Sequence, residues 1–213
     1  MRVAIVSFLN DKQKLLELKE FLKDHKIVRR NPQLVVCYGG DGTLLSAEEK
    51  FPGVKKLFFY KTCRKFKFYE NYKDYFKLDV FLNGKKMFCC LNDVNVHYNL
   101  PRALRFSVEV NHFDWGKGLI GDGVIVSTPF GANGYYRTIV NSGFTKGIGI
   151  AFNNVIRKKF HKVVDENSKI LITIDRETGI LGCDSCDRVY KLKKGDRVLI
   201  RKSKERTSIA RRE

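Results

Sequence analysis

A buried strand that leads directly into a glycine-rich turn is the strongest structural signal in this 213-residue chain. The apolar run 34–38 has the length of a strand, and it stops at Gly39-Gly40-Asp41-Gly42-Thr43, after which a helix is expected. An earlier strand is expected at 3–6, followed by leucines at helical spacing up to residue 25. Strands that alternate with helices are typical of a parallel sheet covered by helices. We therefore expect an α/β domain with a parallel sheet in this part of the chain.

Beyond residue 78 the pattern changes to repeated alternation of apolar and polar residues. Asn83-Gly84 lies between apolar segments, and both residues tolerate the positive φ angles of a tight hairpin turn. Residues 104–110 alternate strictly, and further strands are expected at 119–127, 169–174, 188–192 and 197–200. The sequence thus predicts an α/β domain at 1–78, a β-rich domain at 79–202 and a polar C-terminal tail at 203–213.

The composition excludes two classes of protein. With 43% hydrophobic residues the chain is too apolar to remain disordered, because it can bury enough surface to offset the entropy of ordering. No apolar run approaches the roughly 18 residues of a membrane-spanning helix. The apolar stretch at 3–9 lacks a cleavage site of small residues, so we interpret it as a strand and not as a signal peptide. These features predict a cytoplasmic protein with no membrane partner.

The chain carries a large positive charge. Lys and Arg number 41 against 23 Asp and Glu, which gives a formal net charge of +18. Such a field attracts nucleic acid, phosphorylated substrates or anionic membrane surfaces. Basic residues are dense at 50–69, where they alternate with aromatic residues and no acidic residue intervenes. This segment is typical of a solvated face over buried rings, and it also suits single-stranded nucleic acid or a polyanionic phosphoryl donor.

The cysteines favour reduced thiols. Six cysteines in a chain of this length do not make the dense framework of a disulfide-rich domain. Cys183 and Cys186 have the spacing of half a zinc site, and Cys89 and Cys90 are the candidates for the other half. Adjacent cysteines chelate poorly, and the histidines show no metal-binding spacing, so no residue is assigned to a metal.

The turn at 39–43 has the residue types of a phosphate-binding loop. Ligands of α/β sheets bind outside the carboxyl ends of the strands, where this turn is expected. Its glycines let the backbone approach a phosphate, and the amides of the following helix point toward it. Asp41 repels phosphate, so its presence favours a general base acting on a hydroxyl, or a contact to a magnesium ion. The alternative is a tight turn in which Asp41 caps the helix.

Four segments resemble one enzyme family. Residues 34–45, LVVCYGGDGTLL, resemble the GGDGT segment of the NAD kinases, which diacylglycerol and sphingosine kinases share. Leu91-Asn92-Asp93-Val94 resembles the Asn-acidic motif of NAD kinases, and residues 121–135, GDGVIVSTPFGANGY, resemble their GDG…STPTGSTAY segment. Residues 183–185 and 194–198 resemble the closing strands of the family. The matches follow the family's order from about residue 34 to residue 202.

This resemblance implies a fold and a reaction. The fold is NAD kinase-like, with the α/β and β-rich domains described above and NAD between them. The reaction transfers a phosphoryl group to the 2′-hydroxyl of the adenosine ribose of NAD, which gives NADP. The implied donor is ATP or inorganic polyphosphate, and the implied cofactor is magnesium or another divalent metal ion. Family members are commonly homo-oligomers, so a dimer or tetramer is expected.

The resemblance also implies roles for individual residues. Asp41 would accept the hydroxyl proton. The donor phosphates would be cradled by the rest of the turn, namely Gly39, Gly40, Gly42 and Thr43. The dinucleotide would be bound by residues of the β-rich domain, namely Asn92, Asp93, Asp122, Asn133 and Tyr135. Asp122 would come from a neighbouring subunit.

The third motif departs from the family's pattern. Phe130 stands where the family has Thr or Ser, and Ala132 and Gly134 remove further polar groups. Asn133 is then the main polar side chain of this loop, because its amide can both donate and accept hydrogen bonds. We expect a pocket with fewer hydroxyl groups than the family's pattern provides.

Other interpretations of the same residues stay open at this point. Asn92-Asp93 also fits an ordinary turn, and Asp122, which lies between two glycines, also fits a β-bulge. Tyr135 also fits a core aromatic residue. A nucleic-acid-binding module would use the positive charge without needing an acidic residue in the turn. A lipid kinase would share the GGDGT segment, but the chain shows no amphipathic membrane helix, and the second and third motifs argue against it.

Overall fold

The computed structural model describes residues 1–156, 160–184 and 188–211. Within these ranges the chain forms two compact units. Unit 1 consists of Met1–Tyr75 together with the residues from Glu205 onward, and unit 2 consists of Phe76–Lys204. The helices in the described ranges are all too short or too polar to cross a membrane.

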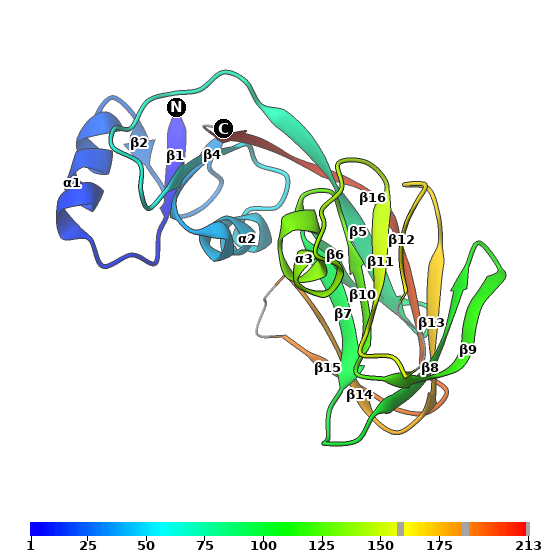
Figure 1. The fold of residues 1–213 in the computed structure, drawn as a ribbon. Coiled ribbons are helices and arrows are strands. Elements are labelled where there is room, and N and C mark those ends of the chain that lie inside the picture. Colours follow the sequence, from blue (N-terminus) through cyan, green and yellow to red (C-terminus); the bar gives the residue numbers. More distant parts are fainter. Residues whose placement is uncertain (157–159, 185–187, 212–213) are drawn as a thin grey trace. The chain divides into compact units, whose positions relative to one another are not determined.

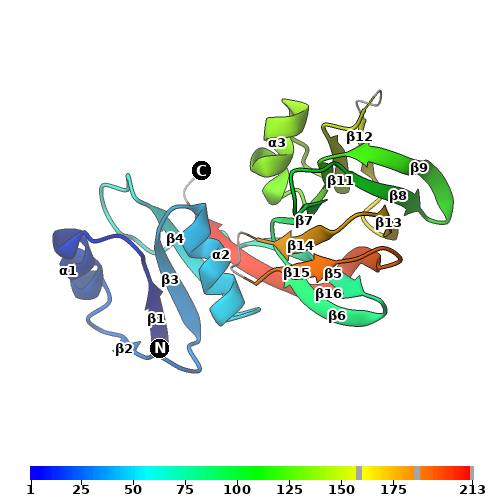
Figure 2. The ribbon, with the colours of Figure 1, turned by 90° about the horizontal axis from the view of Figure 1, so that it is seen from below.

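Unit 1 is built on a parallel sheet. Its strand order is β2 (Lys26–Ile27), β1 (Arg2–Val6), β3 (Leu34–Gly39) and β4 (Lys56–Tyr60), and the end of β16 (Arg197–Arg211) pairs in parallel with β4. Helices α1 (Lys12–Phe21) and α2 (Asp41–Lys50) flank the sheet in both views (Figures 1 and 2). The α/β architecture expected for this part of the chain is confirmed.

The central strand β3 explains why a helix covers each face. All its residues are buried. Val36 and Tyr38 pack in one apolar cluster with Leu18 of α1. Side chains alternate along a strand, so Cys37 points to the other face, where it lies near Glu48 of α2. A strand that is apolar on both faces requires cover on both sides.

A buried ion pair fixes the end of α2 against β4. Lys56 has no exposed surface, and its ammonium group donates to the carboxylate of Glu48. The same ammonium donates to the carbonyl oxygens of Phe51 and Val54, both at 2.8 Å. A buried charge is tolerated when it is paired and its hydrogen bonds are made, as they are here.

Unit 2 consists of two packed sheets with the main apolar core between them (Figure 1). One sheet is antiparallel and contains, in order, β12 (His161–Val164), β11 (Ile148–Asn153), β10 (Gly123–Ser127), β7 (Asp93–Tyr98), β14 (Gly179–Cys183) and β15 (Tyr190–Leu192). The other contains β5 (Lys73–Leu82), β6 (Lys85–Cys90), β8 (Leu104–Val110), β9 (Phe113–Gly121), β13 (Ile170–Arg176) and the first part of β16.

A short helix covers the outer face of the first sheet. Helix α3 (Tyr135–Val140) follows the 3₁₀ segment η1 (Gly131–Asn133). Its Tyr136 packs against Ile125 of β10 and Ala151 of β11. Together with the two sheets described above, this arrangement confirms the β-rich second domain that the sequence predicts.

The structure differs from the expected boundaries at three places. The units divide between residues 75 and 76 and not between 78 and 79. Residues 203–211, expected to be a polar tail, belong to β16, because Thr207 and Ile209 are buried among the exposed Lys and Arg residues. Asp122 separates β9 from β10, where a single strand is expected at 119–127. The Asn83-Gly84 turn is as expected, with φ angles of 50° and 84°.

Candidate functional site

The turn after β3 lies at the carboxyl end of the parallel sheet of unit 1. β3 ends at Gly39, and α2 begins at Asp41 with Gly40 as its N-cap. A Cβ atom at Gly39 would lie 2.3 Å from Thr43 Oγ1, so only glycine fits there. Thr43 is buried, and its side chain lies against Gly39. A Cβ at Gly40 or Gly42 would meet no atom within 4 Å, so the backbone is open to a ligand at these two positions.

Asp41 is exposed at the first position of α2. The helix has no side-chain cap, so Asp41 is not the capping residue that one interpretation of the sequence suggested. Its Oδ1 atom accepts a hydrogen bond of 2.9 Å from the Tyr60 hydroxyl at the end of β4. Burial and this hydrogen bond raise the pKa of Tyr60, so the phenol keeps its proton at neutral pH. The bond orients the carboxylate and leaves Oδ2 for another partner.

In unit 2, Asp184 fixes the turn that precedes β7. Its carboxylate accepts backbone N–H groups from Leu91 at 2.5 Å, Asn92 at 2.6 Å and Asp93 at 3.2 Å. Its own N–H donates to the Asp93 carbonyl at 3.2 Å. Burial raises the pKa of Asp184 to about 6, although these N–H groups oppose the increase. Asp184 therefore holds the backbone of the Asn-acidic motif in place.

Asp93 is itself buried, with 4% of its surface exposed. Its Oδ1 accepts from the Asn95 amide at 2.8 Å, and its Oδ2 accepts from the Asn92 amide at 3.2 Å. Burial raises the pKa of Asp93 to about 6, with the Asn95 bond acting in the opposite direction. The two predicted residues thus lie together, and the carboxylate titrates much closer to neutral pH than an ordinary aspartate.

The loop after β10 packs on this turn. Thr128 Oγ1 donates to the Leu91 carbonyl at 2.6 Å, and the Thr128 N–H donates to the Asn92 carbonyl at 3.0 Å. A Cβ at Gly131 would lie 2.3 Å from the same Asn92 oxygen, so the two backbones approach closely. The second and third sequence motifs therefore form one packed structure in unit 2.

A polar groove of about 590 Å³ opens on the same sheet of unit 2. Asp122 and Tyr135, two of the residues that the sequence analysis expects to bind the dinucleotide, line it. The Asn154 amide donates to Asp122 at 2.7 Å, and the Asn153 amide donates to the Tyr135 hydroxyl at 3.3 Å. The other residues of its lining are Asn95, His97, Tyr98, Gly182 and Cys183. The described lining thus holds one carboxylate and no Lys or Arg, in a chain of net charge +18.

Asn133 lies apart from this groove. It is exposed in η1, and a Cβ at Gly143 would lie 2.7 Å from its Oδ1 atom. Its side chain therefore faces residue 143, and Asn133 is not among the residues that line the groove. Asp93 does not line the groove either, but it is joined to the lining by its hydrogen bond with Asn95.

Several polar residues of this region are not among those expected from the sequence. They are Asn95, His97, Asn153, Asn154 and Asp184. For the polar residues on β7, the sequence signal is a two-residue period, because Asp93, Asn95 and His97 alternate with buried valines. No local pattern marks Asn153 and Asn154, since their place depends on the pairing of β10 with β11.

Two of the thiols considered for a zinc site lie buried in this region. Cys186 lies outside the described residues. Cys90 and Cys183 are both buried free thiols. Burial, together with a hydrogen bond to Cys183, raises the pKa of Cys90 well above its usual value. Among the described residues, neither of these two thiols belongs to a group of three side chains that could hold a metal ion.

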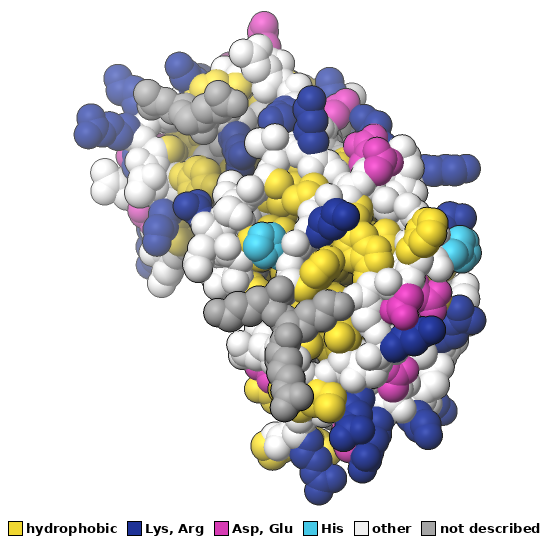
Figure 3. Space-filling view, turned by 45° about the vertical axis from the view of Figure 1, so that its right-hand side comes forward, with side chains coloured by type: hydrophobic (Ala, Val, Ile, Leu, Met, Phe, Trp, Pro, Cys, Tyr) yellow, Lys and Arg dark blue, Asp and Glu magenta, His cyan; other side chains and the backbone are white. Residues whose placement is uncertain are grey.

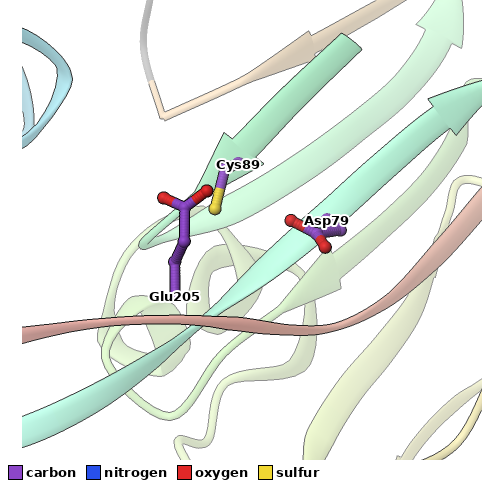
Figure 4. A group of neighbouring side chains, drawn as sticks. All are labelled: Asp79, Cys89 and Glu205. Atoms are coloured by element: carbon purple, nitrogen blue, oxygen red, sulfur yellow. The ribbon is translucent and has the colours of Figure 1, made fainter. Parts of the chain in front are cut away.

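One further cluster brings three side chains with metal-binding atoms within 4.8 Å of one another. They are Asp79 on β5, Cys89 on β6 and Glu205 on β16 (Figure 4). The Asp79 carboxylate already pairs with the Lys86 ammonium at 2.7 Å. Burial raises the pKa of Asp79, but hydrogen bonds from Lys86 and Ser203 outweigh it and hold the value below normal. The charge of Asp79 is thus already compensated by a side chain.

Comparison with known proteins identifies the family. The family model of the ATP-NAD kinase C-terminal domain matches residues 91–212, more than half of the chain. The chain belongs to the NAD kinase family. This match contains the Asn-acidic motif and the third motif, so it separates the chain from the lipid kinases that share the GGDGT segment. The resemblance seen in the sequence is confirmed.

Known members of the NAD kinase family agree in sequence and fold. NAD kinases of several Streptococcus pneumoniae strains, among them Hungary19A-6, are 30% identical over an alignment of 153 residues, and this match covers 59% of this chain and 55% of theirs. The chain spans about half the length of these curated relatives. An NAD kinase from Archaeoglobus fulgidus in complex with ATP has a TM-score of 0.77 at 18% identity, covering 100% of this chain and 94% of that one. Yeast NADH kinase complexed with NADH has a TM-score of 0.81 at 15% identity, covering 100% and 84%.

Proposed function

We propose that this protein phosphorylates the 2′-hydroxyl of the adenosine ribose of NAD, giving NADP, with ATP or inorganic polyphosphate as donor. The observation that carries the proposal is the family match over residues 91–212, which contains the packed turn of Asn92 and Asp93. The exposed carboxylate of Asp41 supports it, because phosphoryl transfer to a hydroxyl needs a group that can take the proton.

The donor phosphates would bind the turn of unit 1. The backbone at Gly40 and Gly42 is open, and the first amides of α2 have no side-chain cap. Such amides attract anions at a helix N-terminus. Thr43 is buried against Gly39, so it would act through its backbone and by shaping the turn.

The turn of unit 1 fits a magnesium ion that is held mainly by the donor phosphates. Magnesium is commonly held by one or two carboxylates together with substrate phosphates and water. Asp41 is not part of a cluster of metal-binding side chains among the described residues, so the ion would be held mainly by the donor. When bound, it would neutralise charge on the phosphates.

Asp41 would act as the general base. With Oδ1 held by Tyr60, Oδ2 is free to accept the proton of the acceptor hydroxyl. The hydroxyl oxygen would form a bond to the terminal phosphorus of the donor, while the bond to the shortened donor breaks. The carboxylate would receive the proton as the new bond forms.

The dinucleotide would bind unit 2 through two groups of residues. Asn92 and Asp93 offer amide and carboxylate atoms to its hydroxyl groups. Asp122 and Tyr135 line the polar groove. The proposal includes assembly into a homo-oligomer in which Asp122 serves a neighbouring subunit, and light scattering on the purified protein tests the assembly.

The test is direct. The purified chain is incubated with NAD and magnesium and with either ATP or polyphosphate, and NADP is detected with an NADP-specific dehydrogenase. Formation of NADP with one or both donors supports the proposal and identifies the donor. Absence of NADP with both donors, from protein with a cooperative unfolding transition, contradicts it.

Asp41→Asn should lower kcat about 10²–10⁴-fold with a much smaller change in the KM for NAD, because a positioned base acts mainly in the transition state. Asp24→Asn removes another exposed carboxylate of unit 1 and should leave both constants unchanged. Near-normal turnover in Asp41→Asn would exclude the general-base role.

A further inference from the structure

A second groove, of about 580 Å³, lies on unit 2 away from the residues discussed so far. It crosses the outer face of the sheet that contains β13 and β16. On these strands Ile172 and Ile200 point into the core, whereas the alternate residues Leu171 and Leu199 are only half-buried. The polar groove lies on the other sheet, with the core between the two, so the two grooves are separate.

The floor of this groove is apolar. Leu171 and Leu199 are directly opposite each other in the pairing of β13 with β16, so their side chains are neighbours on the same face. Phe81 of β5 extends this surface, and the Arg201 guanidinium lies 5.0 Å from the centre of its ring. An apolar floor of this size suits a chain or ring of a small molecule.

The walls of the groove are two hairpin turns, and both are tied to the sheet. Asn83 donates to the Asp196 carboxylate at 2.9 Å and accepts the Arg197 N–H at 2.9 Å. Asn111 accepts the Lys169 N–H at 2.8 Å and donates to the Ser168 hydroxyl at 3.2 Å. Because side chains fix both turns, the groove exists before any ligand binds.

The rim of the groove is positively charged. Arg197 and Arg201 point to the same face of β16, about 13 Å apart along the strand, and Lys169 is on β13. Among the described residues, none of these three side chains pairs with a carboxylate. Glu109 is the one carboxylate of the described lining, and it lies on β8, beyond Leu171 from β16. On the face drawn in Figure 3, exposed apolar patches lie beside Lys and Arg side chains and also beside some Asp and Glu side chains.

We propose that this groove binds a small amphipathic anion. Its apolar chain or ring lies on Leu171 and Leu199, and its phosphate or carboxylate group binds Arg197 and Arg201. A polyphosphate or a nucleic acid would use the cations but not the leucine floor, and a neutral lipid would use the floor but not the cations. Glu109 directs the anionic group toward β16 by repelling it from β8.

Calorimetric titration of the full chain with four probes tests whether the groove binds an amphipathic anion. The probes are decyl phosphate, decanoate, inorganic phosphate and decyltrimethylammonium, each below its micelle concentration. Decyl phosphate and decanoate should bind, inorganic phosphate should bind about tenfold more weakly or not at all, and the cation should not bind. The ratio between the first two probes tells whether the groove prefers phosphate or carboxylate. No turnover is needed, so the result is independent of NAD phosphorylation.

Two double variants separate the groove from the overall charge. Arg197→Gln with Arg201→Gln should weaken decyl phosphate binding about tenfold or more, because charge-assisted hydrogen bonds are lost. Lys146→Gln with Lys191→Gln removes the same charge from exposed positions of unit 2 outside the groove and should change nothing. Leu199→Thr should weaken decyl phosphate but not inorganic phosphate.

Three results would overturn the proposal. They are no binding of either amphipathic anion, equal weakening by the two double variants, or binding of decyl phosphate that Leu199→Thr leaves unchanged. Light scattering gives a further check. If the wild-type chain binds no probe and the Arg197→Gln, Arg201→Gln variant dissociates an oligomer, the groove is an interface between copies and not a ligand site.

Discussion

Asp93 links the stability of the protein to the affinity of its proposed site. In the folded chain its pKa is about 6, against an ordinary value of 3.8. Between these values the folded state holds a proton that the unfolded state releases, so the free energy of unfolding rises as the pH falls from 6 toward 4. The charged carboxylate is the better acceptor for ligand hydroxyls, so NAD affinity should fall over the same range. Asp184 contributes to stability with the same sign.

Comparison of wild type with Asp93→Asn isolates the effect of this carboxyl, because other groups also titrate. The stability of the variant relative to wild type should increase by about 2–3 kcal/mol between pH 4 and pH 7, since only wild type then buries a charge. Urea unfolding at several pH values measures this difference. A difference that does not change with pH would mean that Asp93 has an ordinary pKa. Calorimetry should also show that the variant binds NAD weakly at every pH.

Asp122 is the only acidic side chain in the described lining of the polar groove, which holds no Lys or Arg. The oxidised nicotinamide ring carries a positive charge and the reduced ring does not. If this groove takes the nicotinamide end, Asp122→Asn should lower kcat/KM for NAD about tenfold and change that for NADH little. Asp114→Asn, an exposed carboxylate of unit 2 outside the groove, is the matched control. An unchanged ratio between the two substrates would place this ring elsewhere.

At the scale of elements, the β3–α2 turn depends on one close contact. Gly39→Ala should destabilise the protein by about 1–3 kcal/mol, because the new Cβ would lie 2.3 Å from Thr43 Oγ1. Adding Thr43→Ala should recover part of this loss. Gly42→Ala meets no atom, so it should leave stability nearly unchanged while it lowers turnover if donor phosphates approach there. Urea unfolding and NADP formation measure both effects. Equal destabilisation by Gly39→Ala and Gly42→Ala would contradict the contact.

The sequence predicts those elements whose signal is local. The turn at Asn83-Gly84, the strand into Gly39 and the alternating strand β8 each follow from neighbouring residues. The pairing of Asn92 with Asp93 is predicted as well, because the two are adjacent in one motif. These features need no knowledge of distant parts of the chain.

Contacts between distant segments could not be predicted in the same way. Asp184 reaches the turn at residue 92 only because β14 pairs with β7. Asn154 meets Asp122 across the pairing of β10 with β11, and Asn133 turns toward residue 143 although it lies in a family motif. The strand at 203–211 is hidden in the sequence by its exposed Lys and Arg residues. Each depends on tertiary packing and not on local pattern.

At the scale of the whole molecule, the net charge of +18 predicts weak binding of any polyanion. Affinity for a single-stranded oligonucleotide should fall about tenfold or more from low to physiological salt, because bound counterions are released on binding. NADP formation should continue at the higher salt. Fluorescence anisotropy and the NADP assay, in the same buffers, provide the comparison. Tight oligonucleotide binding by protein that forms no NADP would favour a nucleic-acid-binding function instead.

Strand β16 has a consequence for how the protein is made. The edge of the unit 1 sheet is completed by residues 209–211, which pair with β4 some 150 positions earlier in the chain. During synthesis on the ribosome, β4 therefore keeps an unpaired edge until all of unit 2 has been translated. An open edge strand is a template for unwanted pairing, so this interval is when the nascent chain is most exposed to aggregation. Slow translation of the segment between the two strands would lengthen that exposure.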